Sequence, residues 1–332
     1  MYRCSNCGAP LDVSPDSVVV VCRYCGAPNF VAGGKGEVLA VPTLTSSEIL
    51  KRAVERTRRD FNLGRRMREL SFASPELVYV PFYFVDVALS ASYAAVVTVT
   101  YTRTVYVRGQ PRTRLETRRV QVSGRVRLVE KVPVVARRAA WGKSLDRLAE
   151  HFLKTAPRAV VLADVAKDAS TSAAFLAAEF DAERAKAKAV RAVLPELLSA
   201  VEEDAARKAR IKVGVLAASA VVEDKAVDYE VEKVEASPIT YLPMWIAPYV
   251  YRGSFYKYYV AGWDGSVVVA EEPAFVEHKV MSGLAAAAAA GFGGGVLAAG
   301  DVFVGALGAA AGAVLAYMAS GGLLKSRRLE SR

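Results

Sequence analysis

All four cysteines of this chain lie within its first 25 residues, in two Cys-x-x-Cys-Gly motifs. A Cys-x-x-Cys pair presents two thiolates about one tetrahedral edge apart, and the glycine that follows lets the chain turn so that amide groups point at the sulfurs. Two such motifs on facing hairpins close a tetrahedral metal site. The spacing therefore predicts structural Zn²⁺, with iron in the same cage as the alternative. The predicted ligands are Cys4, Cys7, Cys22 and Cys25.

The same motifs argue against disulfides and against catalysis at this site. Paired motifs suit a metal better than two disulfides, and the rest of the chain has the character of a cytosol-facing protein. Sulfur would fill all four coordination positions, which leaves none open for a substrate. The sequence has two histidines and offers no serine–histidine–aspartate arrangement. We therefore expect a protein that is not an enzyme.

The length of 332 residues is enough for two or three structural units. The first is the zinc ribbon, residues 1–32. A body of helices and antiparallel strands is expected over residues 42–275, and a two-helix transmembrane hairpin over residues 281–324. The predicted fold class is therefore α+β.

Within the body, the spacing of apolar residues changes several times. A capping box formed by Thr45 and Glu48 predicts the start of an amphipathic helix. Alternation along residues 120–128 predicts an antiparallel strand with one buried and one solvated face. The alanine-rich residues 170–210 predict a helix that Pro195 kinks or breaks. The other expected segments are strands over 76–137 and 227–270 and a short helix over 144–155.

A weak internal repeat links two strands of the body. Residues 79–84 (YVPFYF) and 241–246 (YLPMWI) both place a proline among large apolar residues at a tyrosine-containing strand. Proline cannot donate a hydrogen bond to a sheet and suits a strand start or edge. Two interpretations stay open. The body consists of two related β-units, about 42–140 and 141–275, that share one sheet, or the likeness is a coincidence.

Residues 281–324 contain one charged side chain, Asp301. Each half of the segment is about long enough to cross a hydrocarbon core of ~30 Å. Gly-x-x-x-Gly spacing in both halves favours close packing of two helices. Lys279 precedes the segment and Lys325 follows it with several arginines, so the positive-inside rule places both ends in the cytoplasm. The expected localisation is the cell membrane, with the N-terminal body and the C-terminus cytoplasmic. A soluble alanine-rich helical pair is the alternative.

The formal net charge of +10 is concentrated in the first half of the chain. Residues 1–138 carry 22 basic residues against 11 acidic ones, whereas residues 139–332 carry 22 against 23. The excess lies at 51–70 and 101–138. It indicates a cationic surface that faces the phosphates of lipid headgroups or of nucleic acid, or a solvated arginine-rich face.

Tyrosines are frequent over residues 249–259, where Arg252 and Lys257 are interleaved with them. Such a pattern can stack single-stranded bases, but alternating tyrosines more often fill one face of a sheet. His151 lies beside the apolar positions of the short helix and is expected to be a partly buried structural residue.

Taken together, these features resemble a poorly characterised family of prokaryotic membrane proteins with a TFIIB-type zinc ribbon. The resemblance spans nearly the whole chain, and its most specific part is the strand with the Pro-Met-Trp sequence. Departures are Ala261, where the family has an Asn-Gly turn, and the arginine-rich segment 101–138. The matching segments are 4–11 (CSNCGAPL), 22–26 (CRYCG), 42–48 (PTLTSSE), 78–86 (VYVPFYFVD), 242–253 (LPMWIAPYVYRG), 261–265 (AGWDG) and 271–273 (EEP).

The resemblance implies a cytosolic metal-bearing module tethered to the membrane, and it supplies no settled activity. Some bacterial members look linked to membrane-stress systems of the phage-shock type. The expected function is that of a non-enzymatic scaffold or adaptor. Its partners would be the lipid bilayer, through residues 281–324, and an unidentified protein. The alternative is a nucleic-acid-binding protein that uses the basic strands at 101–138.

Overall fold

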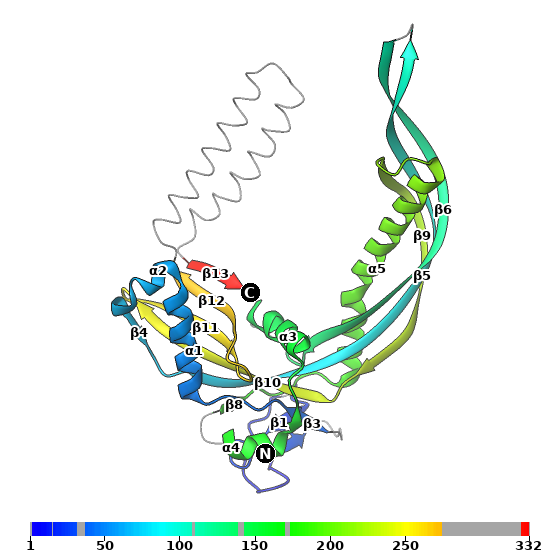
Figure 1. Ribbon diagram of the computed structural model, residues 1–332. Helices are drawn as coiled ribbons and strands as arrows, with labels where there is room; N and C mark the ends of the chain where they lie inside the picture. The colour runs from blue at the N-terminus through cyan, green and yellow to red at the C-terminus, as the bar shows by residue number, and fades with distance from the viewer. Residues whose placement is uncertain are drawn as a thin grey trace.

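The computed structural model describes residues 2–14, 16–31, 37–107, 110–138, 143–169, 173–273 and 327–331. A small N-terminal sheet contains β1 (Val19–Val21) and β2 (Pro28–Phe30). The remaining strands of the described residues form one 11-stranded, largely antiparallel sheet (Figure 1), so the predicted α+β class is confirmed. The elements of this body are β3 (Val38–Ala40), α1 (Ser46–Arg59), α2 (Phe61–Gly64), η1 (Met67–Glu69), β4 (Leu70–Phe72), β5 (Glu76–Val107), β6 (Gln110–Val135), α3 (Lys143–Thr155), β7 (Val160–Val161), α4 (Leu162–Ala169), β8 (Ala173–Phe175), α5 (Ala182–Val213), β9 (Ser219–Ala236), β10 (Ile239–Tyr251), β11 (Ser254–Ala261), β12 (Val267–Pro273) and β13 (Arg327–Ser331).

Strands β5 and β6 form a long hairpin that projects from the body as a curved arm (Figure 1). They contain 32 and 26 residues. Strand β9 pairs with the other edge of β5 along residues 85–100, so the lower arm has three strands and the tip has two. In β6 the predicted alternation is confirmed, because Val122 is buried while Gln121 and Ser123 are exposed.

Helix α5 covers one face of the three-stranded part of the arm. Its small and aliphatic side chains recur about every four residues, which places them on one stripe against the sheet. The Asp181 side chain caps the first turn by accepting from the Arg184 N–H, and Gly214 ends the helix at φ 79°. The buried stripe consists of Ala185, Ala189, Val193, Leu197, Val201, Ala205, Ala206 and Ala209.

Of the predicted kink or break at Pro195, the break is wrong, because α5 runs through this residue for 32 residues in all. A proline inside a helix removes one backbone hydrogen bond and crowds the preceding turn, at a cost of ~3 kcal/mol. The neighbours Val193 and Leu197 are fully buried against the arm. Burial of the whole stripe offsets the loss of one hydrogen bond, so tertiary packing overrides the local signal.

At the other end of the sheet, strands β10, β11, β12 and β13 lie in order. The predicted capping box opens α1, since Thr45 and Glu48 each accept a hydrogen bond from the other's backbone N–H. Helix α1 packs on one face through Ile49, which belongs to the larger buried cluster. Helix α3 packs on the other face through Leu145 and Leu148.

Strand β13 returns the chain to the edge of this sheet. It pairs antiparallel with β12, and Arg327 lies opposite Pro273. The predicted hairpin at 281–324 falls between these two residues and lies outside the described part of the chain. Within the described part, no helix is both long and apolar enough to cross a membrane.

The two segments of the internal repeat pair with each other. Tyr79 lies opposite Pro243, and Pro81 lies opposite Tyr241, so a local two-fold axis relates β5 to β10. The Pro81 carbonyl accepts a hydrogen bond from the Ala136 N–H, and the Pro243 carbonyl accepts one from the Gly262 N–H, at 2.9 Å in both cases. Ala136 directly follows β6, the hairpin partner of β5, and Gly262 directly follows β11, the hairpin partner of β10.

The neighbours of β5 and β10 repeat the same arrangement. Strand β8 pairs in parallel with β5, with Phe175 opposite Tyr79, and β3 pairs in parallel with β10, with Ala40 opposite Tyr241. Leu176, directly after β8, donates its N–H to the Tyr79 carbonyl, and Val41, directly after β3, donates its N–H to the Tyr241 carbonyl, at 3.0 Å in both cases. Two sets of elements therefore correspond: β3-α1-β4-β5-β6 and β8-α5-β9-β10-β11.

These two sets exchange strands. Strands β3 and β4 of the first set pair with β10 of the second, whereas β8 and β9 of the second pair with β5 of the first. Each set thus completes its sheet only with strands from the other. The division into related units of about 42–140 and 141–275 by common descent stays a prediction.

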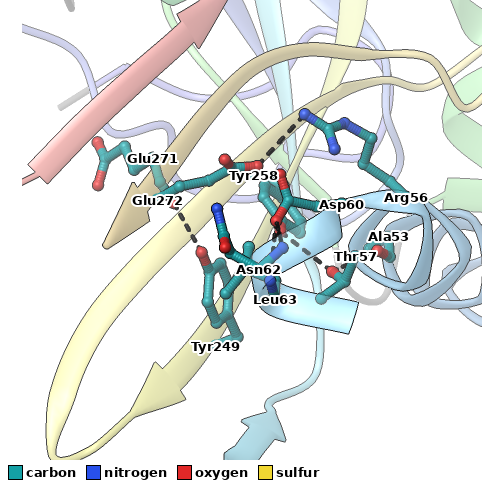
Figure 2. Close-up of polar contacts among 10 residues, drawn as sticks. All are labelled: Ala53, Arg56, Thr57, Asp60, Asn62, Leu63, Tyr249, Tyr258, Glu271 and Glu272. Carbon is teal, nitrogen blue, oxygen red and sulfur yellow. Dashed lines mark hydrogen bonds and ion pairs between the residues drawn. The ribbon is translucent and has the colours of Figure 1, made fainter. Parts of the chain in front are cut away.

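A buried polar network fastens α1 to the sheet (Figure 2). Arg56 forms an ion pair with Glu272 of β12 at 3.3 Å, and the Thr57 hydroxyl lies 3.0 Å from the hydroxyl of Tyr258. The Tyr249 hydroxyl donates to the backbone carbonyl of Glu271, at 2.9 Å. Burial raises the pKa of Tyr258 to about 12, so its hydroxyl stays protonated. These tyrosines are core residues, which confirms the sheet-face interpretation of the tyrosine pattern.

The Arg56–Glu272 pair gives a stability prediction. The Glu272 side chain is 3% exposed and that of Arg56 is 15% exposed. We expect Glu272→Leu to lower the free energy of unfolding by about 3 kcal/mol, because it leaves a poorly solvated guanidinium without its carboxylate. The exposed pair between Arg252 and Glu69 is the control, and Glu69→Leu should cost less than about 1 kcal/mol. Urea denaturation of both variants measures the difference, and equal losses would contradict the prediction.

Candidate metal centre

The two cysteine turns, residues 4–10 and 22–28, share the sequence Cys-x-x-Cys-Gly-Ala-Pro. Gly8 and Gly26 adopt φ of 75° and 70°, which a side chain would strain. In each turn the glycine N–H donates to the carbonyl of the first cysteine, at 2.9 and 2.8 Å. The first cysteine in turn donates its N–H to the alanine carbonyl, at 2.8 and 3.0 Å. The repeated sequence therefore produces two turns with the same backbone geometry.

These turns bring together all four cysteines that the sequence predicted as ligands. The Sγ atoms of Cys4 and Cys25 lie 3.6 Å apart, and those of Cys7 and Cys22 lie 3.7 Å apart. All four sulfurs lie within 4.8 Å of one another. Four sulfurs at ~2.3 Å from a tetrahedral Zn²⁺ are separated by about 3.8 Å. The sulfur cluster could therefore hold a metal ion of this kind, and its sulfur–sulfur distances are far from those of a disulfide.

Electrostatics within the cluster also favour a cation once the thiols ionise. Burial opposes ionisation of Cys4, but backbone N–H groups and the Asn29 amide outweigh it and lower the pKa of this thiol to about 6. The backbone of Ala9 acts to lower the pKa of Cys7, yet the neighbouring thiols raise it to about 12. One thiolate forms readily, and its charge then suppresses ionisation of the next. Four thiolates can coexist only around a positive ion.

Asn29 supports the site and was missed by sequence reasoning. It lies in β2 with 7% of its surface exposed, and its Nδ2 donates to the Cys4 sulfur at 3.6 Å. Its Oδ1 accepts from the Ser5 N–H at 2.8 Å. The only local signal is its place directly after the second turn, in a three-residue strand. Such a residue orients a ligand without touching the metal.

Backbone hydrogen bonds, an ion pair and the buried side chains of Val19 and Val21, which belong to the larger core cluster, attach the N-terminal segment to the body. The Val19 carbonyl accepts a hydrogen bond from the Ala178 N–H at 2.9 Å, and the Val18 N–H donates to the Ala178 carbonyl at 2.7 Å. Asp16 forms an ion pair with Arg138 at 2.7 Å. These contacts fix the orientation of the cysteine cluster without surrounding it.

The basic segment 101–138 is largely neutralised in its lower part by a strand that is distant in sequence. Arg119 pairs with Glu223 at 2.8 Å, and Arg127 pairs with Glu232 at 2.6 Å. Both carboxylates come from β9, which lies across β5 from β6. The lower arm is therefore a solvated face of paired charges. Its cationic excess, as counted in the sequence, does not persist in the fold.

His151 lies on α3, where its Nε2 is 2.7 Å from a carboxylate oxygen of Asp264 and its ring stacks on Trp263 at 5.5 Å. The side chain is 23% exposed. This agrees with the predicted role of a partly buried structural histidine.

Comparison with known proteins finds no matching family model, no matching curated protein and no matching solved structure. The function of the chain must therefore be argued from its own geometry.

Proposed function

We propose that this protein is a non-enzymatic scaffold that is anchored in the cell membrane by residues 281–324. A structural zinc ribbon (residues 1–32) and the α+β body would lie on the cytoplasmic side, where they bind a protein partner. The resemblance to ribbon-bearing membrane proteins suggests a role in membrane stress.

The pairing of β13 with β12 carries the membrane part of this proposal. Pro273 and Arg327 are opposite each other, so the segment between them leaves the body and returns at one point. A chain that crosses a bilayer twice returns to the side from which it started. Closure of the segment at one sheet edge therefore supports a hairpin anchor with both ends in the cytoplasm.

The zinc part rests on the sulfur geometry and on the donor set. Four thiolates give a closed tetrahedral site, which is typical of structural rather than catalytic zinc. Zn²⁺ bound there would hold the two cysteine turns together in a segment with little core of its own.

The tip of the arm supports a surface for phosphates. Beyond residue 100 the hairpin has two strands, and directly opposed residues share a face. Arg103 lies opposite Arg114 on one face. Arg112 and Arg114 form no ion pair with any described residue, whereas Arg103 pairs with Glu116 at 3.7 Å. Like charges directly opposite each other destabilise a sheet; Glu116 offsets part of this repulsion, and a bound anion would offset the rest.

The other face of the tip is rich in threonine and exposes Tyr106 and Leu115, which are 76% and 68% exposed. A thin ribbon with one cationic face and exposed aromatic and aliphatic side chains on the opposite face fits the interface between water and anionic lipid.

Membrane fractionation with an alkaline carbonate wash tests the anchor. The full chain should stay in the pellet. A variant in which a glycine–serine linker replaces residues 281–324 should become soluble and keep its fold, because it retains β13. A simple truncation at residue 280 would also remove β13, so loss of the anchor could not be distinguished from loss of this strand. A full chain that washes off the membrane would rule out the integral anchor.

Charge variants at the tip test the headgroup surface. We expect Arg112→Gln combined with Arg114→Gln to weaken binding to phosphatidylglycerol vesicles by about 2 kcal/mol, or about thirtyfold. The matched control is Arg119→Gln combined with Arg127→Gln, which removes the same charge from sites already paired with β9. Vesicle sedimentation measures both, and an equal loss in the control would contradict a specific role of the tip.

The opposed arginines of the tip also favour a second candidate, nucleic-acid binding. A two-stranded ribbon with one cationic face can follow a phosphate backbone. In that case the linker-replaced variant should bind duplex DNA or RNA at physiological salt, with an affinity that falls steeply as salt rises. Absence of binding under these conditions would remove this candidate.

A further inference from the structure

A second cationic site lies at the far end of the sheet from the arm. A cavity of about 490 Å³ is bounded by α1, by α3 and by the turn between β11 and β12. In Figure 1 strands β11 and β12 run between these two helices. Its lining includes the start of β12, at Val267 and Val268, before β12 begins to pair with β13.

The walls of this cavity bring together cations from two helices. Arg52, Arg56 and Arg59 lie on one face of α1, because they are four and three residues apart. Lys154 of α3 lines the same cavity. Arg56 is held by Glu272, but Arg52, Arg59 and Lys154 form no hydrogen bond or ion pair with any described residue.

The acidic residues of the cavity neutralise its cations only in part. The carboxylate of Asp264 is engaged by the His151 ring at 2.7 Å, by the Ser266 N–H at 3.0 Å and by the Ser266 hydroxyl at 2.9 Å. Glu55 is the other carboxylate in the lining. With Arg56 paired to Glu272, the cations Arg52, Arg59 and Lys154 remain beside the carboxylates of Glu55 and Asp264, which leaves an excess of one positive charge.

The turn at Gly265 allows Arg52 to approach the strand. Gly265 adopts φ 72°, and a Cβ at this position would lie 2.9 Å from the Cγ of Arg52. The absence of a side chain therefore leaves room for the aliphatic stem of Arg52 against the turn. This contact positions the guanidinium at the cavity.

We propose that this cavity binds the phosphate group of a phosphomonoester. Arginine forks and a lysine ammonium are the groups that recognise phosphate oxygens best. The volume exceeds that of phosphate alone and suits a small polar ester. Apart from His151, the lining has no aromatic ring on which a nucleobase could stack. This site goes beyond the scaffold function and does not depend on the membrane anchor, because a soluble ester and a lipid headgroup share the chemistry.

Two probes with the same phosphate group test the proposal on the full chain. Glycerol 3-phosphate is the soluble form, and phosphatidic acid in phosphatidylcholine vesicles is the lipid form. We expect binding of at least one probe, and we expect Arg52→Met and Arg59→Met each to weaken it by about tenfold. Methionine retains the unbranched stem and removes the charge. Arg58→Met, in the same helix but outside the cavity lining, is the matched control and should bind as the parent does.

The outcomes separate the two sources of phosphate. Arg52-dependent binding of glycerol 3-phosphate would show that a soluble ester is sufficient. Arg52-dependent binding of vesicles alone would assign the site to a lipid headgroup. Lys154→Met, on the other helix, provides an independent variant if an α1 variant does not fold. Absence of binding by both probes, or an equal loss in Arg58→Met, would overturn the proposal.

Discussion

Replacement of Cys4 or Cys22 by serine is expected to abolish metal binding and to unfold residues 2–31, while the body keeps its fold. Each cysteine supplies one of four sulfurs within 4.8 Å of one another. Structural zinc in small ribbons contributes ~10–16 kcal/mol of apparent binding free energy, which is most of their stability. The N-terminal strands β1 and β2 have three residues each, and the burial of Val19 and Val21 in the core of the body does not hold the two cysteine turns together.

Metal content per chain and limited proteolysis measure this result. Tyr24→Ser is the matched control, since Tyr24 lies between two ligands, is 57% exposed and contributes no sulfur. A chelator should reproduce the effect of the cysteine variants in the parent chain. Retention of one metal ion per chain and of a protected N-terminal segment in Cys4→Ser would exclude the four-cysteine site.

Division of the body between β6 and α3 is expected to leave neither half folded. The fragment 37–140 would contain β5 without β9 and β8, and it would contain β3 and β4 without β10. An unpaired β5 exposes backbone donors and acceptors along residues 85–100, together with the apolar face that α5 covers. We therefore expect neither fragment alone to show a cooperative unfolding transition.

The measurement is circular dichroism with urea denaturation of each fragment alone and of the two produced together. We expect cooperative unfolding only in the mixture, because each half then receives the strands that it lacks. Fragments that unfold cooperatively on their own would show that the exchange of strands is not required for stability. A division within the Gly-rich residues 32–36 is the control and should leave the body intact.

Sequence reasoning succeeds where the deciding contacts are local. Thr45 and Glu48 are three residues apart, and their reciprocal hydrogen bonds appear as predicted. Each cysteine turn depends on a five-residue motif, Cys-x-x-Cys-Gly, and on its glycine, which permits positive φ. Alternation along β6 follows from the strand repeat alone.

Sequence reasoning fails where the partner is distant. Arg119 and Arg127 look like a cationic surface until β9, about a hundred residues later, places Glu223 and Glu232 beside them. Arg56 has the appearance of a solvated helix residue, yet the fold buries its ion pair. No feature of a single segment reports the strand that will lie beside it.

The exchange of strands between the two sets of elements also constrains how the protein is made. As the chain leaves the ribosome, β5 and β6 emerge long before β9, and β3 and β4 emerge long before β10. The nascent first half therefore has open strand edges until about residue 250 has been synthesised. Its folding must wait for contacts that span about two hundred residues, such as that of Ala40 with Tyr241. During this interval, protection from aggregation must come from outside the chain.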